Sequence, residues 1–295
     1  MIELKKIMVI GSMSTDFVVT SEIIPAEGET VIGESFKTFF GGKGANQAIA
    51  SCRAGVETFM LGAVGDDVFG QKIIQNLNDQ GVNTEMMQVI ENMESGSAHI
   101  QIKDGDNRII VVPSSNYELS SERIKPYLDA MEKMDMLVLQ NEIPYETIQF
   151  VIKKGAEMNV PVLLNPAPAL TLTQTEIEKV DYLTPNDKEF AIMFPEQDLE
   201  TVLAKYPNKL IVTLGDEGAI YHDGAKIVQI PARKVSSEKV VDTTGAGDTF
   251  NGYFAAAIVE GHSMIEAIQF ANHAASLSIQ AHGAQQGIPK RKDLE

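Results

Sequence analysis

Cysteine, long apolar runs and positive charge are all scarce in this chain. Cys52 is the single cysteine among 295 residues, which excludes an intrachain disulfide and a cysteine-based metal cluster and fits a reducing compartment. No stretch approaches the roughly 18 uninterrupted apolar residues of a membrane span. The net charge of −17 argues against nucleic acid or an anionic membrane as a partner. A cytoplasmic protein is therefore expected.

The sequence alternates short apolar runs with longer helical patterns. The first ten residues are expected to form a buried strand rather than a signal peptide, because their apolar run is short and a Gly-Ser turn follows. Runs of strand length occupy residues 7–10, 59–64, 137–140, 162–165, 182–184 and 210–214, and helical patterns occupy residues 46–54, 69–80, 121–134 and 145–158. This alternation predicts an α/β fold, with a doubly wound, mostly parallel sheet covered by helices on both faces.

Two stretches have no helix between their strands. Residues 31–40 and 97–112 alternate apolar with polar side chains, and the second stretch contains a turn at residues 104–107. Alternation indicates one covered face and one wet face, so these stretches suit a small antiparallel sheet set apart from the main one. With no low-complexity linker and no internal repeat, residues 1–295 are expected to form a single domain.

The string Asp242-Thr-Thr-Gly-Ala-Gly-Asp-Thr-Phe-Asn-Gly252 has the features of a phosphoryl-transfer site. A Gly-Ala-Gly turn precedes an apolar run of helical length, and a helix start of this kind binds anions through its unpaired N–H groups and its dipole. Asp248 would lie in the first helical turn, where beside a bound phosphate it is a candidate general base. Gly-x-Gly-Asp alone would more simply be an ordinary loop before a helix, but the full string is far more specific.

This string, together with Gly41-Gly-Lys-Gly-Ala-Asn46 and Thr184-Pro-Asn-Asp-Lys-Glu189, resembles the ribokinases and the wider phosphofructokinase-B family of carbohydrate kinases. The resemblance runs from Gly11-Ser-Met-Ser-Thr-Asp16 to Gly283-Ala-Gln-Gln-Gly-Ile-Pro289, which is nearly the whole chain. It implies ATP-dependent phosphorylation of a sugar, first of all D-ribose to ribose 5-phosphate. It also implies a β lid, built from about residues 12–40 and 95–115, that covers the sugar and often packs against a second subunit. A homodimer through the lid is therefore expected.

The resemblance assigns roles to the catalytic and sugar-binding positions. It makes Asp248 the general base and the backbone N–H groups of Gly245, Ala246 and Gly247 the anion hole. Without the family, Asp16 could equally be a turn residue that caps its own backbone, Asn46 a helix-start residue and Glu142 a solvated loop charge. The residues expected to contact the sugar are Ser14, Asp16, Gly42, Lys43, Asn46, Glu142 and Asp248.

Two departures from the family pattern leave the acceptor open. Ser14 stands where ribokinases usually have Asn, and Ser114-Ser115-Asn116 stands where they usually have Gly-Ala-Asn. A site that reads hydroxyls through hydrogen bonds can change its preference sharply when one partner is lost. Another sugar or a nucleoside therefore stays an alternative acceptor. A non-catalytic sugar or nucleotide sensor is the alternative from another class, although the intact Asp248, Asn186 and Glu189 count against it.

The nucleotide and metal positions also rest on the resemblance. Asn186 and Glu189 stand three apart at a helix start, which suits them to hold water around Mg²⁺, although the same spacing is typical of a simple helix cap. Around the ATP, the family implies Asn186, Thr213, Gly215, Gly218, Gly247, Asp248 and Asn272. An activating K⁺ ion would be bound by Asp242 and Thr244 together with backbone around Ser278, Ala281, Gly283 and Gly287. Gly287 replaces a common serine, so one ligand could be lost or supplied by water.

Overall fold

A parallel sheet forms the centre of the molecule. The computed structural model describes residues 4–104 and 106–294. Five strands pair in the order β11–β10–β9–β1–β4, and every pairing is parallel. Their bounds are β1 (Lys6–Ile10), β4 (Glu57–Leu61), β9 (Met136–Gln140), β10 (Val162–Asn165) and β11 (Tyr182–Leu183). The predicted parallel sheet is thus confirmed.

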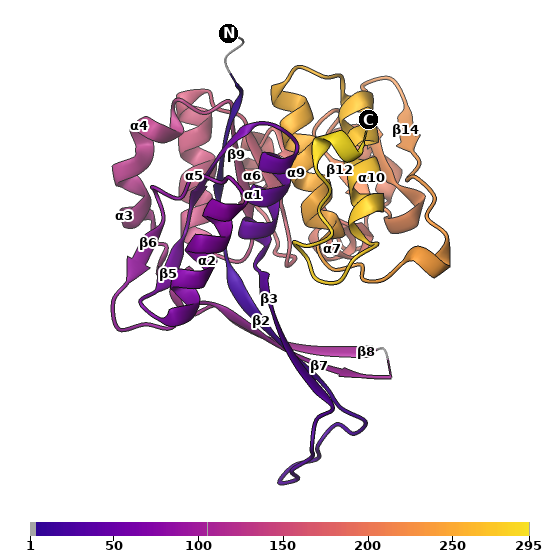
Figure 1. Cartoon of the computed structure of the whole chain (residues 1–295). Helices are drawn as coiled ribbons and strands as arrows, with labels where there is room; N and C mark the ends of the chain where they lie inside the picture. Colours follow the sequence, from indigo (N-terminus) through magenta and orange to yellow (C-terminus); the bar gives the residue numbers. More distant parts are fainter. Residues whose placement is uncertain (1–3, 105, 295) are drawn as a thin grey trace.

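Helices cover both faces of this sheet (Figure 1). Along β1, Ile7 and Val9 belong to one buried core while Met8 and Ile10 belong to the other, as the two-residue period of a strand requires. The first core is closed by α1 (Lys43–Arg53), α2 (Val68–Asp79), α9 (Ala246–Val259) and α10 (Met264–Ser278). The second is closed by α5 (Tyr145–Met158), α6 (Gln174–Lys179), α7 (Asp187–Met193) and α8 (Leu199–Lys205). Within the described part of the chain, no helix has the length and apolarity needed to cross a bilayer.

Three local features differ from the sequence-based expectation. The run at residues 59–64 is divided, because β5 (Ala63–Gly65) leaves the main sheet to pair with β6 (Gln88–Ile90). The pattern at 121–134 is interrupted at Pro126, giving α3 (Ser121–Ile124), η2 (Lys125–Tyr127) and α4 (Leu128–Met131). The run at 210–214 becomes β12 (Ile211–Thr213), whose η3 turn (Gly215–Glu217) leads into an antiparallel sheet with β13 (Ala219–His222) and β14 (Ile227–Ile230).

A second sheet projects from the body as a lid (Figure 1). Its order is β3–β2–β7–β8, from β2 (Ser14–Thr20), β3 (Ser35–Gly41), β7 (Ser97–Lys103) and β8 (Asp106–Val112). Two antiparallel hairpins are joined by a parallel pairing of β2 with β7. Gly105, in the predicted turn at 104–107, and residues 1–3 of the predicted first strand lie outside the described residues. After β8 the chain returns to the body through η1 (Ser114–Glu118).

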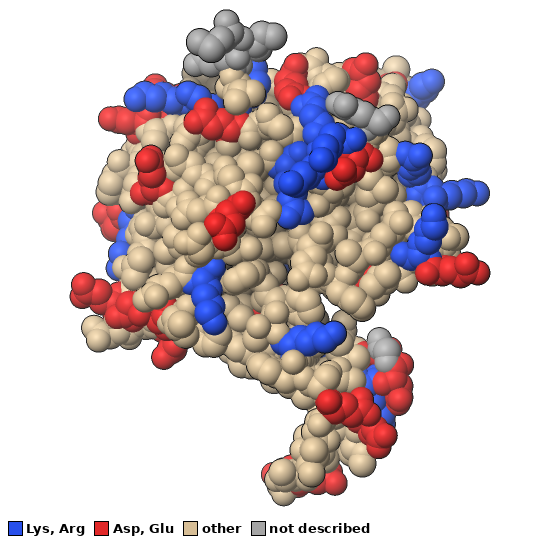
Figure 2. Space-filling model, viewed as in Figure 1, with Lys and Arg blue, Asp and Glu red and all other residues tan. Residues whose placement is uncertain are grey.

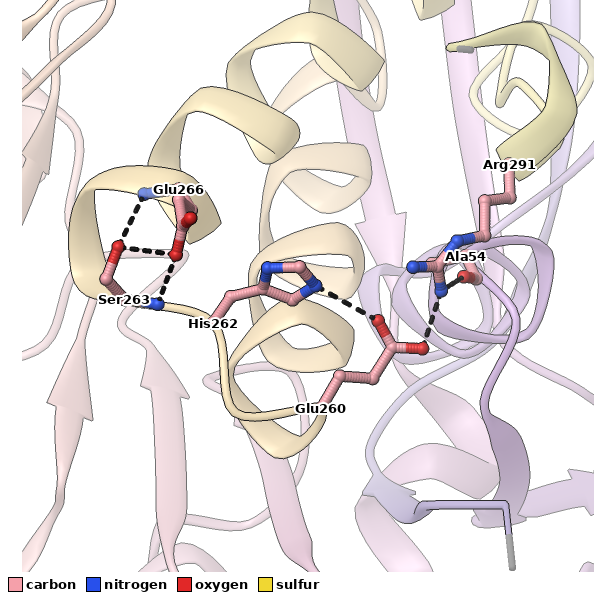
Figure 3. A network of polar contacts seen from close by, with 6 residues as sticks. All are labelled: Ala54, Glu260, His262, Ser263, Glu266 and Arg291. Atoms are coloured by element: carbon pink, nitrogen blue, oxygen red, sulfur yellow. Dashed lines mark hydrogen bonds and ion pairs between the residues drawn. The ribbon is translucent and has the colours of Figure 1, made fainter. Parts of the chain in front are cut away.

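The C-terminal segment is fastened to the body by polar contacts (Figure 3). Within η5 (Arg291–Asp293), Arg291 donates from Nη1 to the Ala54 carbonyl at 2.9 Å and to Glu260 Oε1 at 2.5 Å. Glu260 also pairs with His262 at 3.6 Å, and Ser263 caps the start of α10 in a box with Glu266. These contacts join the ends of α1, α9 and α10. Another short turn, η4 (Ser237–Lys239), lies in the segment between β14 and α9.

Candidate active site

A cavity of about 620 Å³ lies between the lid and the body. Figure 2 shows the surface turning inward there. The lid contributes apolar side chains from β7 and β8, among them Ile100, Ile109 and Val111. The body contributes polar groups from the ends of β-strands and the starts of α1, α7 and α9. The cavity brings together ten of the predicted residues, namely Ser14, Asp16, Gly42, Lys43, Asn46, Glu142, Glu189, Thr244, Gly245 and Asp248.

Asp248 sits in the first turn of α9, at the bottom of this cavity. The helix starts from Gly245 in a left-handed conformation with φ of 79°, and among the described residues no side chain caps it. A Cβ built at Gly247 would meet nothing within 4 Å of the described structure, so the side-chain position of Gly247 faces open space. The carboxylate itself is buried, and each of its oxygens accepts from an amide, Oδ2 from Asn46 at 2.8 Å and Oδ1 from Gln47 at 2.9 Å.

The carboxylates of Asp16 and Glu142 also line the cavity. Asp16, in β2, accepts a hydrogen bond at Oδ1 from the Ser14 hydroxyl at 2.9 Å. Glu142, just after β9, accepts at Oε2 from the Ser12 hydroxyl at 2.5 Å and from the backbone N–H of Lys43 at 3.0 Å. Glu142 is therefore a fixed part of the cavity rather than a solvated loop charge. The backbone of the turn before α1 lies against Met13. Only glycine suits this position, because Gly42 has a φ of 87° and a Cβ on it would be 2.3 Å from the Met13 Cα.

The charges in the cavity influence one another. Burial raises the pKa of Asp16 to about 6, against the Ser14 hydrogen bond and with help from the carboxylates of Glu142 and Asp248. Burial acts to lower the pKa of Lys43, but the carboxylates of Asp248, Glu142 and Glu189 outweigh it and the pKa is raised. Lys43 therefore supplies a positive charge in a cavity that otherwise collects negative ones.

Asn186 and Glu189 form a capping box at the start of α7. Asn186 Oδ1 accepts from the Glu189 N–H, and Glu189 Oε2 accepts from the Asn186 N–H, both at 2.8 Å. The helix cap considered from the spacing is thus present, and it also fixes Glu189 at the cavity wall. Burial raises the pKa of Glu189. Among the described residues no cluster of three or more His, Cys, Asp or Glu side chains could hold a metal ion.

The positions predicted for K⁺ lie mostly together. Asp242 accepts from the N–H groups of Thr244 and Gly283, each at 2.9 Å. Burial acts to raise the pKa of Asp242, but these hydrogen bonds outweigh it and the pKa is lowered. A Cβ at Gly287 would be 2.0 Å from the Ser278 carbonyl oxygen, so this backbone leaves no room for the serine common at that position. Ala281 lies in the turn between Ser278 and Gly283.

Apart from Asp248, the predicted nucleotide residues lie outside the lining of this cavity. Thr213 ends β12 and bridges to Asn186, while Gly215 and Gly218 shape the turn into β13. Asn272 is buried in α10, where its amide donates to the carbonyls of Ile230 and Pro231. It thereby holds the segment after β14 against α10. Ala246, in the first turn of α9, lies beside Gly247.

Sequence reasoning missed four residues that shape the site. They are Ser12, which binds Glu142; Gln47, which binds Asp248; Gln285, which donates to Asn46; and Asn116, which pairs with both backbone groups of Met13. Gln47 had a signal, because it is a polar residue amid the small apolar residues of α1. The other three depend on contacts between distant segments. By contrast, Ser114 and Ser115 donate their hydroxyls to the carbonyls of Glu94 and Ala63, outside the cavity.

The fold is a doubly wound α/β core with a second, projecting sheet, and a buried carboxylate lies at the start of α9. The pfkB family carbohydrate kinase profile matches residues 4–291, and the chain belongs to this family. It is 48% identical to the ribokinase of Bacillus subtilis over 99% of both chains. It is 35% identical to the deoxyribokinase of Salmonella typhi, over 96% of this chain and 95% of that one. The solved structure of Arabidopsis thaliana ribokinase complexed with ribose and ATP superposes with a TM-score of 0.90 at 32% identity, covering 99% and 98% of the two chains.

The Asp16 carboxyl should titrate with a midpoint near pH 6, measured by ¹³C NMR with Asp16→Asn to assign its signal. Ser14→Ala should move the midpoint higher, because the Ser14 hydrogen bond favours the ionised form. Since the pKa of Asp16 in the folded protein lies above the ordinary aspartate value of 3.8, ionising Asp16 destabilises the fold as the pH rises through this interval, and the penalty is absent below it. A midpoint near 4 would contradict this account of the site.

Proposed function

We propose that this chain is a ribokinase, which transfers the γ-phosphoryl group of ATP to the primary hydroxyl of D-ribose. The observation that carries the proposal is the buried Asp248 carboxylate at the uncapped start of α9, in one cavity with Asp16. The hydroxyl oxygen bonds to the γ-phosphorus as the bond to the leaving ADP oxygen breaks, and Asp248 takes the hydroxyl proton. The N–H groups of Gly245, Ala246 and Gly247 hold the charge on the transferred group.

The acceptor is proposed to lie between the lid and the carboxylates of Asp16, Glu142 and Asp248. Asp16 accepts hydrogen bonds from adjacent sugar hydroxyls, with Ser14, Gly42, Lys43, Asn46 and Glu142 around it. The apolar side chains of Ala98, Ile100, Ile109 and Val111 face the same space. When the lid closes, these side chains exclude bulk water from the reacting groups, and this protects the phosphoryl group from hydrolysis.

The nucleotide is proposed to bind on the α7 and α10 side. Glu189 and Asn186 fit a Mg²⁺ ion held through water, since the capping box fixes one carboxylate at the cavity wall. Mg²⁺ would screen the negative charge of the ATP phosphates. Thr213, Gly215, Gly218 and Asn272 are the proposed nucleotide-side residues, with Gly247 and Asp248 at the phosphates.

K⁺ is proposed to bind beside the anion hole. The donors there are the Asp242 carboxylate, Thr244 and backbone carbonyls around Ser278, Ala281, Gly283 and Gly287, which is an oxygen set that suits a hard cation. The tight contact of Gly287 with the Ser278 carbonyl supports backbone oxygen, rather than a serine hydroxyl, as the ligand at this corner. Because Asp242 and Thr244 precede Gly245 directly, the ion would steady the turn that aims the anion hole.

A related acceptor is the second candidate. Ser14 is the family departure that lines the cavity and contacts Asp16, so it can change which hydroxyls are read. The similarity to a deoxyribokinase favours 2-deoxyribose within this alternative. Another sugar or a nucleoside also remains a candidate acceptor. A non-catalytic sensor is the alternative of another class, and the ordered surroundings of Asp248 count against it.

A homodimer through the lid is proposed as the assembly. Apolar side chains are exposed on β8 and β3, including Ile110 at 69% and Phe36 at 62%. Patches of this kind commonly mark an interface between proteins. We further propose that residues 1–295 form a single kinase domain. We also propose that the protein lies in the cytoplasm, and the lone, half-buried Cys52 supports this location.

ADP release should be fastest with D-ribose in a panel with 2-deoxyribose, fructose, other pentoses and common nucleosides. Asp248→Asn should lower kcat by about 10²–10⁴-fold with a modest change in KM, because the variant lacks the base. Preference for another acceptor would keep the mechanism and move the specificity to Ser14. Nucleotide binding with no turnover on any acceptor would favour the sensor. Near-normal turnover of Asp248→Asn would show that Asp248 is not the general base.

Replacing K⁺ with tetramethylammonium should lower the initial rate, because the large cation cannot enter an oxygen cage. Asp242→Ala should abolish the dependence on K⁺. Ionic strength is held constant in both series as the control. A rate that is indifferent to the cation would refute the site.

Sedimentation equilibrium should give a dimer for the parent chain and a monomer for Ile110→Asp. The substitution places a charge in the proposed apolar interface while leaving the buried cores untouched. Ile265→Asp, at an exposed apolar position on α10, is the matched control and should stay dimeric. A monomeric parent would end the proposal.

A further inference from the structure

We infer that Gln47 is a positioning residue that holds the Asp248 carboxylate in register with the acceptor. The inference rests on the proposed role of Asp248 as general base. Gln47 lies in α1 and is 0% exposed, and its Nε2 donates to Asp248 Oδ1 at 2.9 Å. It does not line the cavity, whereas its neighbour Asn46 does. Gln47 can therefore act on phosphoryl transfer only indirectly, and Asp248 is the cavity residue to which its side chain is hydrogen-bonded.

The amide of Gln47 has one orientation fixed by its partners. Nε2 also donates to Asn165 Oδ1 at 3.0 Å, and Oε1 accepts from Gln140 Nε2 at 2.7 Å. Rotating the amide by half a turn would set oxygen against two acceptors and nitrogen against a donor. The network therefore always presents an N–H to the Asp248 carboxylate.

The partners of Gln47 are themselves held in place. Asn165 donates to the Thr184 carbonyl at 3.0 Å, and Gln140 projects its Oε1 into the space beside Gly11, where a Cβ would be 2.0 Å away. That Oε1 is buried without a hydrogen-bond partner among the described residues. Gln140 thus directs its amide donor at Gln47, while its own oxygen accepts no hydrogen bond from the described residues.

The same network reaches the anion hole. Thr184 donates its hydroxyl to Asn251 Oδ1 at 2.5 Å, and Asn251 donates to the Gly247 carbonyl at 2.8 Å. One set of neutral side chains therefore joins the carboxylate of the base to the peptide beside the anion hole. Neutral donors fix the carboxylate without pairing it with a cation, so its charge remains available for the acceptor proton.

Gln47→Met keeps the length of the side chain and removes the donor. It should lower kcat by roughly 10–100-fold, since a displacement of about 1 Å in a reacting group can cost this much, with KM for sugar and ATP changed less than about threefold. Ser51→Ala is the matched control, because Ser51 is equally buried one turn along α1 and its hydroxyl binds backbone carbonyls of Gln47 and Gly252. It should lower the melting temperature but leave kcat within about twofold.

The decisive measurement repeats Gln47→Met in an Asp248→Ala background. With no carboxylate left to position, the substitution should change the residual rate by less than about twofold, whereas a general structural defect would lower both rates by the same factor. If Asp248→Ala lowers kcat by about 10²–10⁴-fold while Gln47→Met keeps the parental kcat, the positioning role is wrong and the base assignment stands. If Asp248→Ala keeps a near-parental kcat, the base assignment itself fails.

Gln140→Met provides a second route if Gln47→Met does not fold, as judged by circular dichroism. This substitution removes the hydrogen bond to Oε1 of Gln47, which is one contact farther from Asp248 than the Gln47 bond itself. Here kcat should fall by about 3–10-fold with unchanged KM, because Gln47 keeps its bond to Asp248 but loses one restraint. An unchanged kcat in a folded Gln140→Met protein would overturn the inference.

Discussion

The site depends on the hydrogen bonds that hold the buried Asp248 carboxyl group beside other carboxyl groups. Asp248 shares its cavity with Asp16, Glu142 and Glu189, and burying a carboxylate without partners would cost several kcal/mol. Two side-chain amides and the positive end of α9 stabilise it. Those amides come from α1, so the packing of α1 against α9 is set by electrostatics as well as by the apolar core. The position of the turn before α1, and with it the inner end of the lid, follows from that packing.

The sequence predicted the features that short motifs encode. The open helix start, Asp248 in its first turn and the parallel sheet all follow from local spacing and periodicity. The network around Gln47 could not be predicted, because its members Gln140 and Asn165 come from other strands and meet only in three dimensions. The hairpin of β13 and β14 was missed, since its short strands lack clear alternation. Pro126 lies within the predicted helix at 121–134 and interrupts it, because proline has no N–H to donate inside a helix.

Departures from the family pattern prove to have different meanings once the contacts are known. Ser115 and Ser114 bind carbonyls of the body and lie outside the cavity. Glycine is required at position 287 for steric reasons, because the Ser278 carbonyl occupies the space that a side chain would need. Ser14 faces the cavity and bonds to Asp16, so it alone among these departures touches the proposed acceptor space. A motif comparison weighs all of these positions alike, whereas geometry separates them.

The parallel pairing inside the lid also governs the order of events during synthesis. β2 and β7 are joined by residues about 80 positions apart, and the intervening chain builds α1, β4, β5, α2 and β6. The hairpin of β2 and β3 therefore leaves the ribosome with one edge of β2 unpaired until β7 arrives. An unpaired edge of this kind can pair with other chains and lead to aggregation. The sheet proposed to cover the reacting groups in the finished protein thus has an open strand edge in the nascent one.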